Sequence, residues 1–174
     1  MDNSIKDIYT RNKIIEATIN LLSSKEYKTL SINEIINESH ASKSSFYRYF
    51  KSIDNIIEFT ANKLNHLFFN NLTNFDQKEN FTLKVFEFVI KYKKFYFNLY
   101  INNLLNLSLK YTLLYIKDDN DNIETQYNKT IFIYSIYALL DVWFKNNCKE
   151  SPKELQEIVN KNLKFHSFPF VNNI

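Results

Sequence analysis

Apolar residues recur every three or four positions along almost the whole chain, the spacing that places them on one face of an α-helix. Near the N-terminus, five residues share one side of such a helix: Ile14, Ile15, Thr18, Leu21 and Leu22. Short polar segments interrupt the pattern and mark helix ends. The pattern predicts helices at residues 7–24, 32–38, 43–49, 54–71, 81–94, 95–101, 103–116, 122–147 and 152–165, the fourth starting at Ser52 or Asp54.

Two of these segments begin with a capping-box sequence. In the first, the hydroxyl of Ser31 is expected to accept from the backbone N–H of Glu34, whose carboxylate reaches back to Ser31. Ser151 and Glu154 repeat this spacing, with Pro152 at the first helical position, where its missing N–H costs nothing. Both sequences therefore predict well-defined helix starts.

The composition narrows the fold class. The 174 residues include no glycine and only two prolines. Phosphate-binding loops, dinucleotide fingerprints and nucleophile elbows need glycine, and tight β-hairpins favour it. Hydrophobic residues make up 45% of the chain and aromatic residues 17%, enough to build a core. We therefore expect an all-α protein.

Side chains suited to catalysis or metal binding are scattered. His40, His66 and His166 stand far apart, without a cysteine or carboxylate at zinc-ligand spacing, and no catalytic pair or triad is apparent. We expect no enzyme activity, no metal and no cofactor. The single Cys148 cannot form an intrachain disulfide, the N-terminus is polar, and the longest apolar stretch, residues 131–140, is shorter than the roughly 20 residues of a membrane span. These features predict a soluble, cytoplasmic protein that does not contact a membrane.

The predicted helices at residues 32–38 and 43–49, joined by a short turn, have the arrangement of a helix-turn-helix. In this motif the second helix lies in the DNA major groove, so its outward face must be small, polar and basic. We expect Phe46 and Phe50 to face the core, and four residues that meet this requirement to face outward: Lys43, Ser44, Tyr47 and Arg48. The net charge of +3 is compatible with a nucleic-acid partner.

This region resembles the TetR/AcrR family of bacterial transcriptional regulators over about residues 8–68. The matching runs are Arg11–Ala17, Tyr27–Ile35 and Ser42–Ser52, the last ending in Tyr-x-Tyr-Phe-Lys-Ser. The resemblance implies a helix-turn-helix DNA-binding domain at residues 1–52. It also implies a C-terminal helical domain for dimerisation and effector binding at residues 53–174.

The resemblance also implies which residues meet the DNA. Tyr47 would donate its hydroxyl to a phosphate, and Lys43 would neutralise a phosphate or reach a base edge. The other expected contacts are Thr10, Arg11, Ser31, Ser42, Ser44, Ser45, Arg48, Lys51 and Ser52.

Three positions depart from the family pattern. His40 stands where the family usually has a turn glycine, and a left-handed backbone at a non-glycine residue costs about 1 kcal/mol. Ser44 replaces another glycine and would bring a hydroxyl into the groove. Ile53 replaces a lysine, so we expect one common phosphate contact to be lost.

The C-terminal half resembles one subgroup of the family. Residues 91–96 are similar to the segment before the cavity helices, and residues 132–144 and 151–155 to the last two helices, which pair with a second subunit. Residues 131–144 are apolar on nearly every face, which fits a helix between its own core and a partner; a fully buried helix in a monomer is the alternative. The expected interface residues are Tyr134, Tyr137, Ala138, Asp141, Val142, Leu155, Ile158 and Val159.

Aromatic residues at helical spacing in the C-terminal half are either core residues or the lining of an effector pocket. The candidates for pocket lining are Phe68, Phe86, Tyr92, Phe95, Tyr100, Tyr111 and Tyr115. Together these observations predict a homodimeric regulator of transcription that represses from an inverted-repeat operator in double-stranded DNA until an effector releases it. The alternatives are the same fold controlled by a protein partner or acting as an activator, and a helical interaction module that no longer binds DNA.

Overall fold

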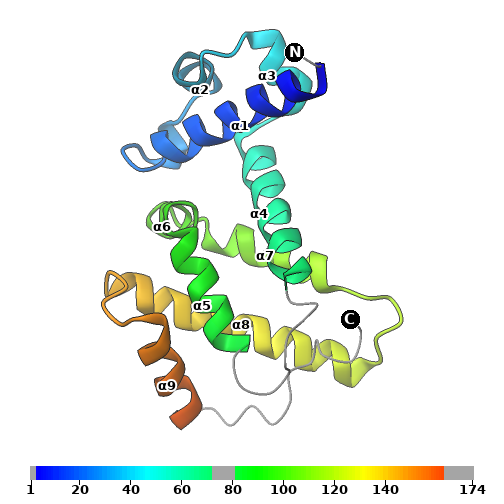
Figure 1. The fold of residues 1–174 in the computed structure, drawn as a ribbon, viewed down its shortest axis with the longest axis vertical. Coiled ribbons are helices and arrows are strands. Elements are labelled where there is room, and N and C mark those ends of the chain that lie inside the picture. Colours follow the sequence, from blue (N-terminus) through cyan, green and yellow to red (C-terminus); the bar gives the residue numbers. More distant parts are fainter. Residues whose placement is uncertain (1–2, 72–80, 163–174) are drawn as a thin grey trace.

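The structure is a computed structural model that describes residues 3–71 and 81–162 (Figure 1). Within these ranges the chain forms α-helices and one short 3-10 helix, with no strand, which confirms the expected all-α fold. The elements are α1 (Asn3–Leu21), η1 (Tyr27–Thr29), α2 (Ile32–Ser39), α3 (Lys43–Tyr49), α4 (Ile53–Asn70), α5 (Phe81–Lys91), α6 (Lys93–Ile101), α7 (Leu105–Ile116), α8 (Ile123–Lys145) and α9 (Pro152–Asn162).

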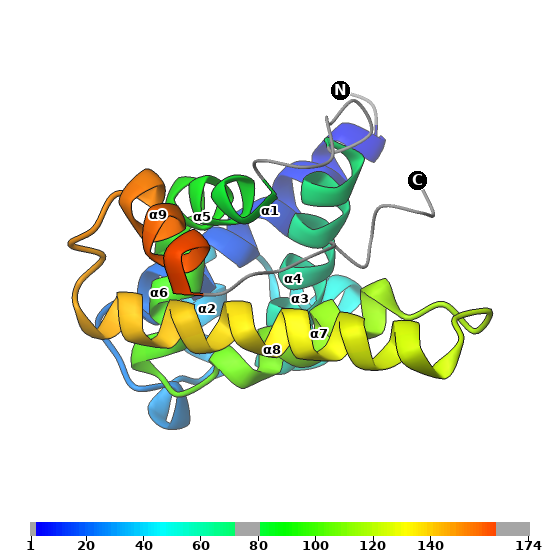
Figure 2. The same cartoon turned by 90° about the horizontal axis from the view of Figure 1, so that it is seen from below.

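The helices fall into two groups connected by α4. Figure 1 shows α1, α2 and α3 clustered at one end, and α4 running from them into a larger group formed by α5–α9. In the larger group α4 packs on α7, and α5 packs on α9. Seen from below, α8 lies in the foreground along the width of the molecule (Figure 2). No helix in the described ranges combines the length and the apolar character required to cross a bilayer.

Two hydrophobic clusters correspond to these groups. The smaller one includes Ile14, Ile35 and Phe46 from the three N-terminal helices, each with an exposed fraction of 0%. The larger one is built around Trp143 and its neighbours on α4–α9. On α4 the side chain of Ile56 belongs to the smaller cluster and that of Ile57 to the larger. This helix therefore contributes to both cores.

Several predicted helix ends differ from the observed ones. The first helix ends at Leu21 instead of residue 24, because the next residues form a turn in which the N–H of Ser23 bonds the carbonyl of Asn20, three positions earlier. The predicted break between residues 94 and 95 lies at Tyr92, which has a non-helical ψ of 27° and no side-chain cap. Both predicted capping boxes are confirmed, at Ser31 and Ser151.

Asn98 of α6 and Asn102, which follows α6, hold the C-terminal end of α1. The side-chain amide of Asn98 donates to the carbonyl of Ile19 at 2.6 Å, and that of Asn102 donates to the carbonyl of Leu22 at 3.0 Å. The side-chain oxygen of Asn102 also accepts from the backbone N–H of Tyr27 at 2.7 Å. Because these bonds cap backbone groups at the end of α1, they fix the N-terminal helices against the C-terminal group.

Candidate nucleic-acid interface and ligand cavity

Local capping interactions set the geometry of α2 and α3. Ser31 and Glu34 exchange reciprocal hydrogen bonds at the start of α2, and the hydroxyl of Ser42 accepts from the N–H of Ser45 at the start of α3. Between the helices His40 adopts the left-handed conformation, with φ 52° and ψ 28°. This confirms the backbone conformation expected at the position of the family glycine, and α2 and α3 on either side of this turn both pack on α1.

The two faces of α3 are divided as predicted. Phe46 has an exposed fraction of 0% and Phe50, immediately after the helix, of 1%, so both belong to the N-terminal core. On the opposite face Lys43 and Ser44 are exposed, and Tyr47 is 51% exposed. The outward orientation follows from the helical repeat, because the two phenylalanines lie four positions apart and fix which side packs inward.

The polar ends of Lys43 and Tyr47 have no partner within the described ranges. Neither the ammonium nor the phenol hydroxyl forms a hydrogen bond or ion pair there, and the Tyr47 ring rests edge-on against Phe46 at a centroid distance of 5.4 Å. An ammonium and a hydroxyl that are exposed on one helix face are groups that can contact phosphate oxygens or base edges.

Arg48 is exposed but engaged with α1. Its guanidinium donates to the carboxylate of Asp7 at 2.9 Å, and the hydroxyl of Tyr49 donates to the same oxygen at 2.7 Å. Burial, and then the hydrogen bond to Asp7, raise the pKa of Tyr49, so its hydroxyl stays protonated. Part of the positive charge of α3 is thus neutralised by a residue, Asp7, that no sequence motif indicated.

The remaining predicted DNA-contact residues are mostly engaged in local structure. Ser42 and Ser52 cap helices, and the hydroxyls of Ser44 and Ser45 lie 2.9 and 2.8 Å from that of Ser42. Thr10 donates to the carbonyl of Lys6. Thr10 lies within α1, whereas the serines lie at the N-termini of α3 and α4, where unbonded backbone N–H groups favour anions.

Arg11 and Lys51 lie apart from that group. The Arg11 guanidinium stands over the Phe59 ring of α4 at 4.8 Å, and its Nε is buried without a hydrogen bond to any described residue. Arg11 thus joins α1 to α4. The backbone N–H of Lys51 donates to the side chain of Asn55 at 3.4 Å, while the Lys51 side chain is exposed.

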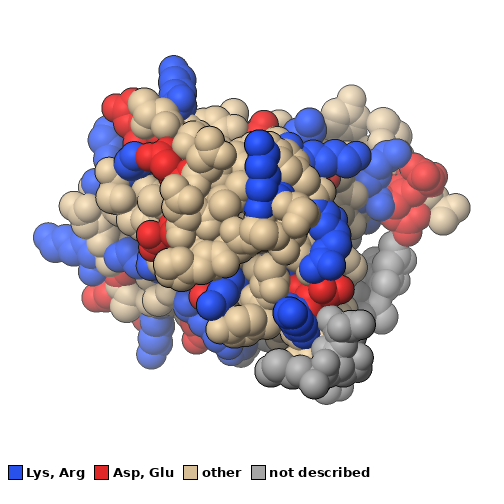
Figure 3. Space-filling view, turned by 90° about the horizontal axis from the view of Figure 1, so that it is seen from above, with Lys and Arg blue, Asp and Glu red and all other residues tan. Residues whose placement is uncertain are grey.

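Figure 3 shows the end of the molecule that carries α1–α3. Lysine and arginine side chains are spread over this face among uncharged ones, and acidic side chains are interspersed with them. In the described ranges, no group of three or more His, Cys, Asp or Glu residues is placed to hold a metal ion.

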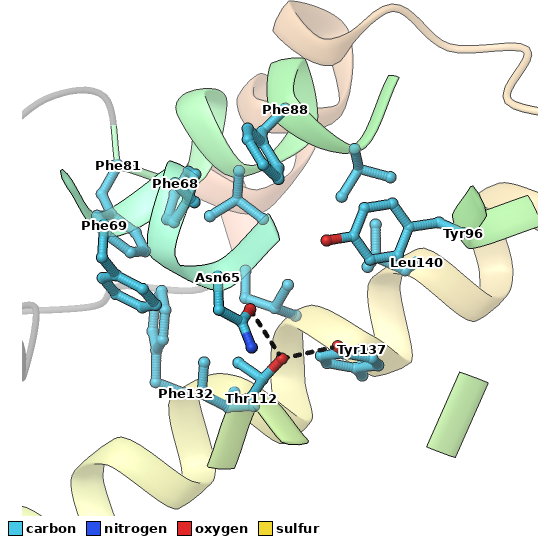
Figure 4. A pocket seen from close by; sticks show the side chains of 14 residues that line it. Asn65, Phe68, Phe69, Phe81, Phe88, Tyr96, Thr112, Phe132, Tyr137 and Leu140 are labelled. Carbon is cyan, nitrogen blue, oxygen red and sulfur yellow. Dashed lines mark hydrogen bonds between the residues drawn. The ribbon is translucent and has the colours of Figure 1, made fainter. Parts of the chain in front are cut away.

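The C-terminal group contains a cavity of about 60 Å³ between α4, α5, α6, α7 and α8 (Figure 4). Of the seven residues predicted to line an effector pocket, Phe68 lines it. The six that do not are Phe86, Tyr92, Phe95, Tyr100, Tyr111 and Tyr115.

The sequence prediction for this cavity selected neighbours of the lining residues. Phe95 packs into the core while Tyr96 faces the cavity, and Phe86 stacks edge-on with Trp143 while Phe88 lines the wall. The spacing of aromatic residues alone did not distinguish the core side of a helix from its cavity side. Three polar residues were also not assigned to the cavity from the sequence: Asn65, Thr112 and Tyr137. Their only signal in the sequence is a polar position on an otherwise apolar helix face, and the prediction considered aromatic spacing alone.

The outward face of α8 carries an apolar stripe, defined as Ile123, Tyr127, Ile131, Tyr134, Ala138 and Val142. All six side chains are exposed, and the exposed fraction lies between 53% and 65% for Ile123, Tyr127, Ile131, Tyr134 and Val142. The opposite face of α8 is buried. The alternative of a helix fully buried within the monomer is therefore excluded.

The residues predicted for a subunit interface divide between surface and core. Tyr134, Ala138, Asp141, Val142 and Ile158 are exposed. In contrast, the structure places Leu155 and Val159, 6% and 1% exposed, in the core of this chain, because α9 turns this face towards α5. Tyr137 faces the cavity, where its hydroxyl lies 3.1 Å from those of Ser108 and Thr112.

Comparison with known proteins gives one family match. Residues 14–58 match the family model described as bacterial regulatory proteins, tetR family. Comparison with curated proteins and with solved structures gives no match. The matched segment runs from the core of α1 through α2 and α3 into α4, and so contains the whole helix-turn-helix described above. The chain is thus a DNA-binding transcriptional regulator with the helix-turn-helix domain of the tetR family.

Proposed function

We propose that this regulator is a homodimeric repressor that leaves an inverted-repeat operator when an effector binds. The observation that carries the DNA-binding part is the pair Lys43 and Tyr47, whose polar ends are exposed on α3 without partners in the described ranges. In the proposed complex α3 lies in the major groove. The Tyr47 hydroxyl donates to a phosphate, and the Lys43 ammonium neutralises a phosphate or reaches a base edge.

The ends of other helices hold the DNA backbone in this proposal. The N-termini of α2, α3 and α4 carry the serine caps Ser31, Ser42 and Ser52, and their free N–H groups suit phosphate oxygens. Arg48 contacts the DNA backbone if its ion pair with Asp7 breaks on binding. If the ion pair persists, it orients α3 instead.

The apolar stripe of α8 supports the dimer. A contiguous row of exposed apolar side chains is typical of a protein–protein contact, and a twofold contact uses the same surface on both subunits. Such a dimer would set two α3 helices about one DNA turn, or roughly 34 Å, apart, which matches an inverted repeat. The proposed functional units are residues 1–52 for DNA binding and 53–174 for dimerisation and control. A regulator of this kind acts where the chromosome lies, so we place it in the bacterial cytoplasm.

Effector control follows from linkage. A ligand that binds more tightly to a form in which the two α3 helices are misaligned weakens DNA binding by the ratio of its affinities for the two forms. The cavity beside α4 supports a small-molecule effector, because α4 contributes to both hydrophobic cores.

A second candidate is control by a protein partner. An open groove between α7 and α8, about 540 Å³ in volume, is bordered by Leu113, Leu114 and Tyr134, and Leu114 is 58% exposed. A partner helix with apolar side chains at helical spacing would fit such a surface. Addition of a small molecule would not release the DNA in this case.

The test begins with selection of bound fragments from the source genome, followed by gel-shift titration on the selected site. We expect Lys43→Ala and Tyr47→Ala each to weaken operator binding by about 1–3 kcal/mol. Loss of the lysine contact should also reduce the slope of log Kd against log salt concentration by about one, because one fewer counterion is released. Lys110→Ala, an exposed lysine on α7, is the matched control and should bind as the wild type does. Wild-type affinity in the folded Lys43→Ala/Tyr47→Ala double variant would contradict the proposed interface.

A further inference from the structure

The cavity beside α4 has an apolar wall without charge. It is lined by fourteen residues from α4, α5, α6, α7 and α8, and none of them is acidic or basic. Most of the wall consists of aromatic rings and branched aliphatic side chains, among them Phe68, Phe81, Phe88 and Phe132. Burying an unpaired charge in such surroundings is strongly unfavourable, so this wall selects against ions.

One polar side chain in this wall has an unused hydrogen-bond donor. Asn65 of α4 is 7% exposed, and its amide Nδ2 is buried with no hydrogen bond to any described residue. Its Oδ1 accepts from the Thr112 hydroxyl at 3.3 Å, and that hydroxyl lies 3.1 Å from that of Tyr137 (Figure 4). The Thr112 hydroxyl also lies 3.1 Å from the carbonyl of Ser108. In this arrangement the amide oxygen of Asn65 faces Thr112, and the amide nitrogen remains for another partner. A buried donor without an acceptor is unfavourable, so an acceptor supplied by a ligand would be bound preferentially.

A second hydroxyl faces the same space. Tyr96 of α6 is 7% exposed, and its side-chain oxygen points into the cavity in Figure 4. That hydroxyl forms no hydrogen bond with a described residue. Burial raises the pKa of Tyr96 well above its ordinary value, so the phenol remains protonated and able to donate. Both the Asn65 amide and the Tyr96 hydroxyl can therefore donate to a ligand.

We propose that this cavity binds a small, uncharged, largely apolar molecule that carries an acceptor oxygen, of the class of a cyclic ketone, ester or ether. The amide of Asn65 donates to that oxygen, and the aromatic wall contacts the hydrocarbon part. The volume of about 60 Å³ exceeds the roughly 10–15 Å³ that one water needs, so the space is larger than a single water would fill. Binding itself does not depend on the proposed function; only its effect on the operator does.

The test uses two probes of the same shape. Cyclohexanone has a carbonyl oxygen where methylenecyclohexane has a CH₂ group. The ratio of their dissociation constants therefore measures what the hydrogen-bond acceptor contributes to binding. Binding is measured on the full chain without DNA, by ligand-observed NMR or calorimetry. We expect Asn65→Leu, which keeps a similar side-chain volume, to shift this ratio about tenfold against the ketone, as loss of one buried hydrogen bond requires. Asn106→Leu, outside the cavity, should leave the ratio unchanged.

Further variants and probes keep the proposal falsifiable. If Asn65→Leu fails to fold, Tyr96→Phe retains the ring and removes only the second donor, and the ketone should again lose affinity relative to the hydrocarbon. An unchanged ratio in the folded variants would overturn the proposal, as would failure of both probes to bind. Cyclohexanecarboxylate binding as tightly as the ketone would also overturn it. If the ketone binds through Asn65 but operator affinity is unaffected, the cavity assignment is supported and the effector part of the proposed function fails.

Discussion

His40 has a left-handed backbone in a chain that contains no glycine. Among the other described residues, Asn103, Asn147 and Cys148 also have positive φ and follow helix ends. These helices therefore end without the glycine that is common at such positions. A side chain with a Cβ atom is strained in this region by about 1–2 kcal/mol. The turn of the DNA-binding motif is therefore built at some cost in stability.

This strain can be measured by comparing two substitutions. We expect His40→Gly to be more stable than His40→Ala by about 1 kcal/mol, because alanine keeps the strained Cβ while glycine does not. Urea unfolding followed by circular dichroism measures the difference. At Glu38, inside α2, the same pair should show the opposite order, since glycine in a helix is less stable than alanine by about 1 kcal/mol. Equal stability of the two His40 variants would contradict the strain.

At the scale of the element, the start of α2 is stabilised by a single carboxylate, that of Glu34. Glu34 accepts hydrogen bonds from the Lys25 ammonium and from the backbone and hydroxyl of Ser31. These bonds, the one from Lys25 first, lower the pKa of Glu34 from 4.5 to about 2. Because the folded-state pKa is below the unfolded value, the stabilisation is complete above about pH 4.5 and is lost as the pH falls towards 2.

Substitution of that carboxylate should change the acid sensitivity of the protein. We expect Glu34→Gln to unfold with a smaller loss of stability between pH 5 and about pH 2 than the wild type, since it has no proton to gain there. Urea midpoints measured across this pH range give the comparison. The control is Glu38→Gln on the same helix, outside the capping box. Identical pH profiles for Glu34→Gln and the wild type would show that the box does not supply this stability.

The elements that the sequence predicted well are those with local signals. Capping boxes and the spacing of Phe46 and Phe50 act within one or two turns, so they located α2 and α3 and the outward face that carries Lys43 and Tyr47. The break at Tyr92 was misplaced because no side chain caps it. The Arg48–Asp7 ion pair joins residues 41 positions apart, and helical periodicity contains no information on such a contact.

At the scale of the whole molecule, the proposed effector control requires that the two helix groups be mechanically coupled. The bonds from Asn98 and Asn102 to the end of α1 join residues 75 to 80 positions apart, and α4 belongs to both cores. We therefore expect a shift of α6 or α4 to displace α1, against which α3 packs. In a dimer, the α8 stripe would hold two such units at a fixed separation.

That role of the stripe can be tested with one charge. We expect Val142→Asp to raise the dissociation constant of the dimer by at least about tenfold, because a carboxylate buried in an apolar contact loses its hydration without gaining a partner. Sedimentation velocity across a concentration series measures this. Ile101→Asp, at a 46% exposed apolar position on α6, is the matched control and should leave the dimer intact. Since a monomer holds one α3 helix, Val142→Asp should bind a palindromic site hardly better than a single half-site, whereas the control should retain the full preference. Unchanged assembly in folded Val142→Asp would place the subunit contact elsewhere.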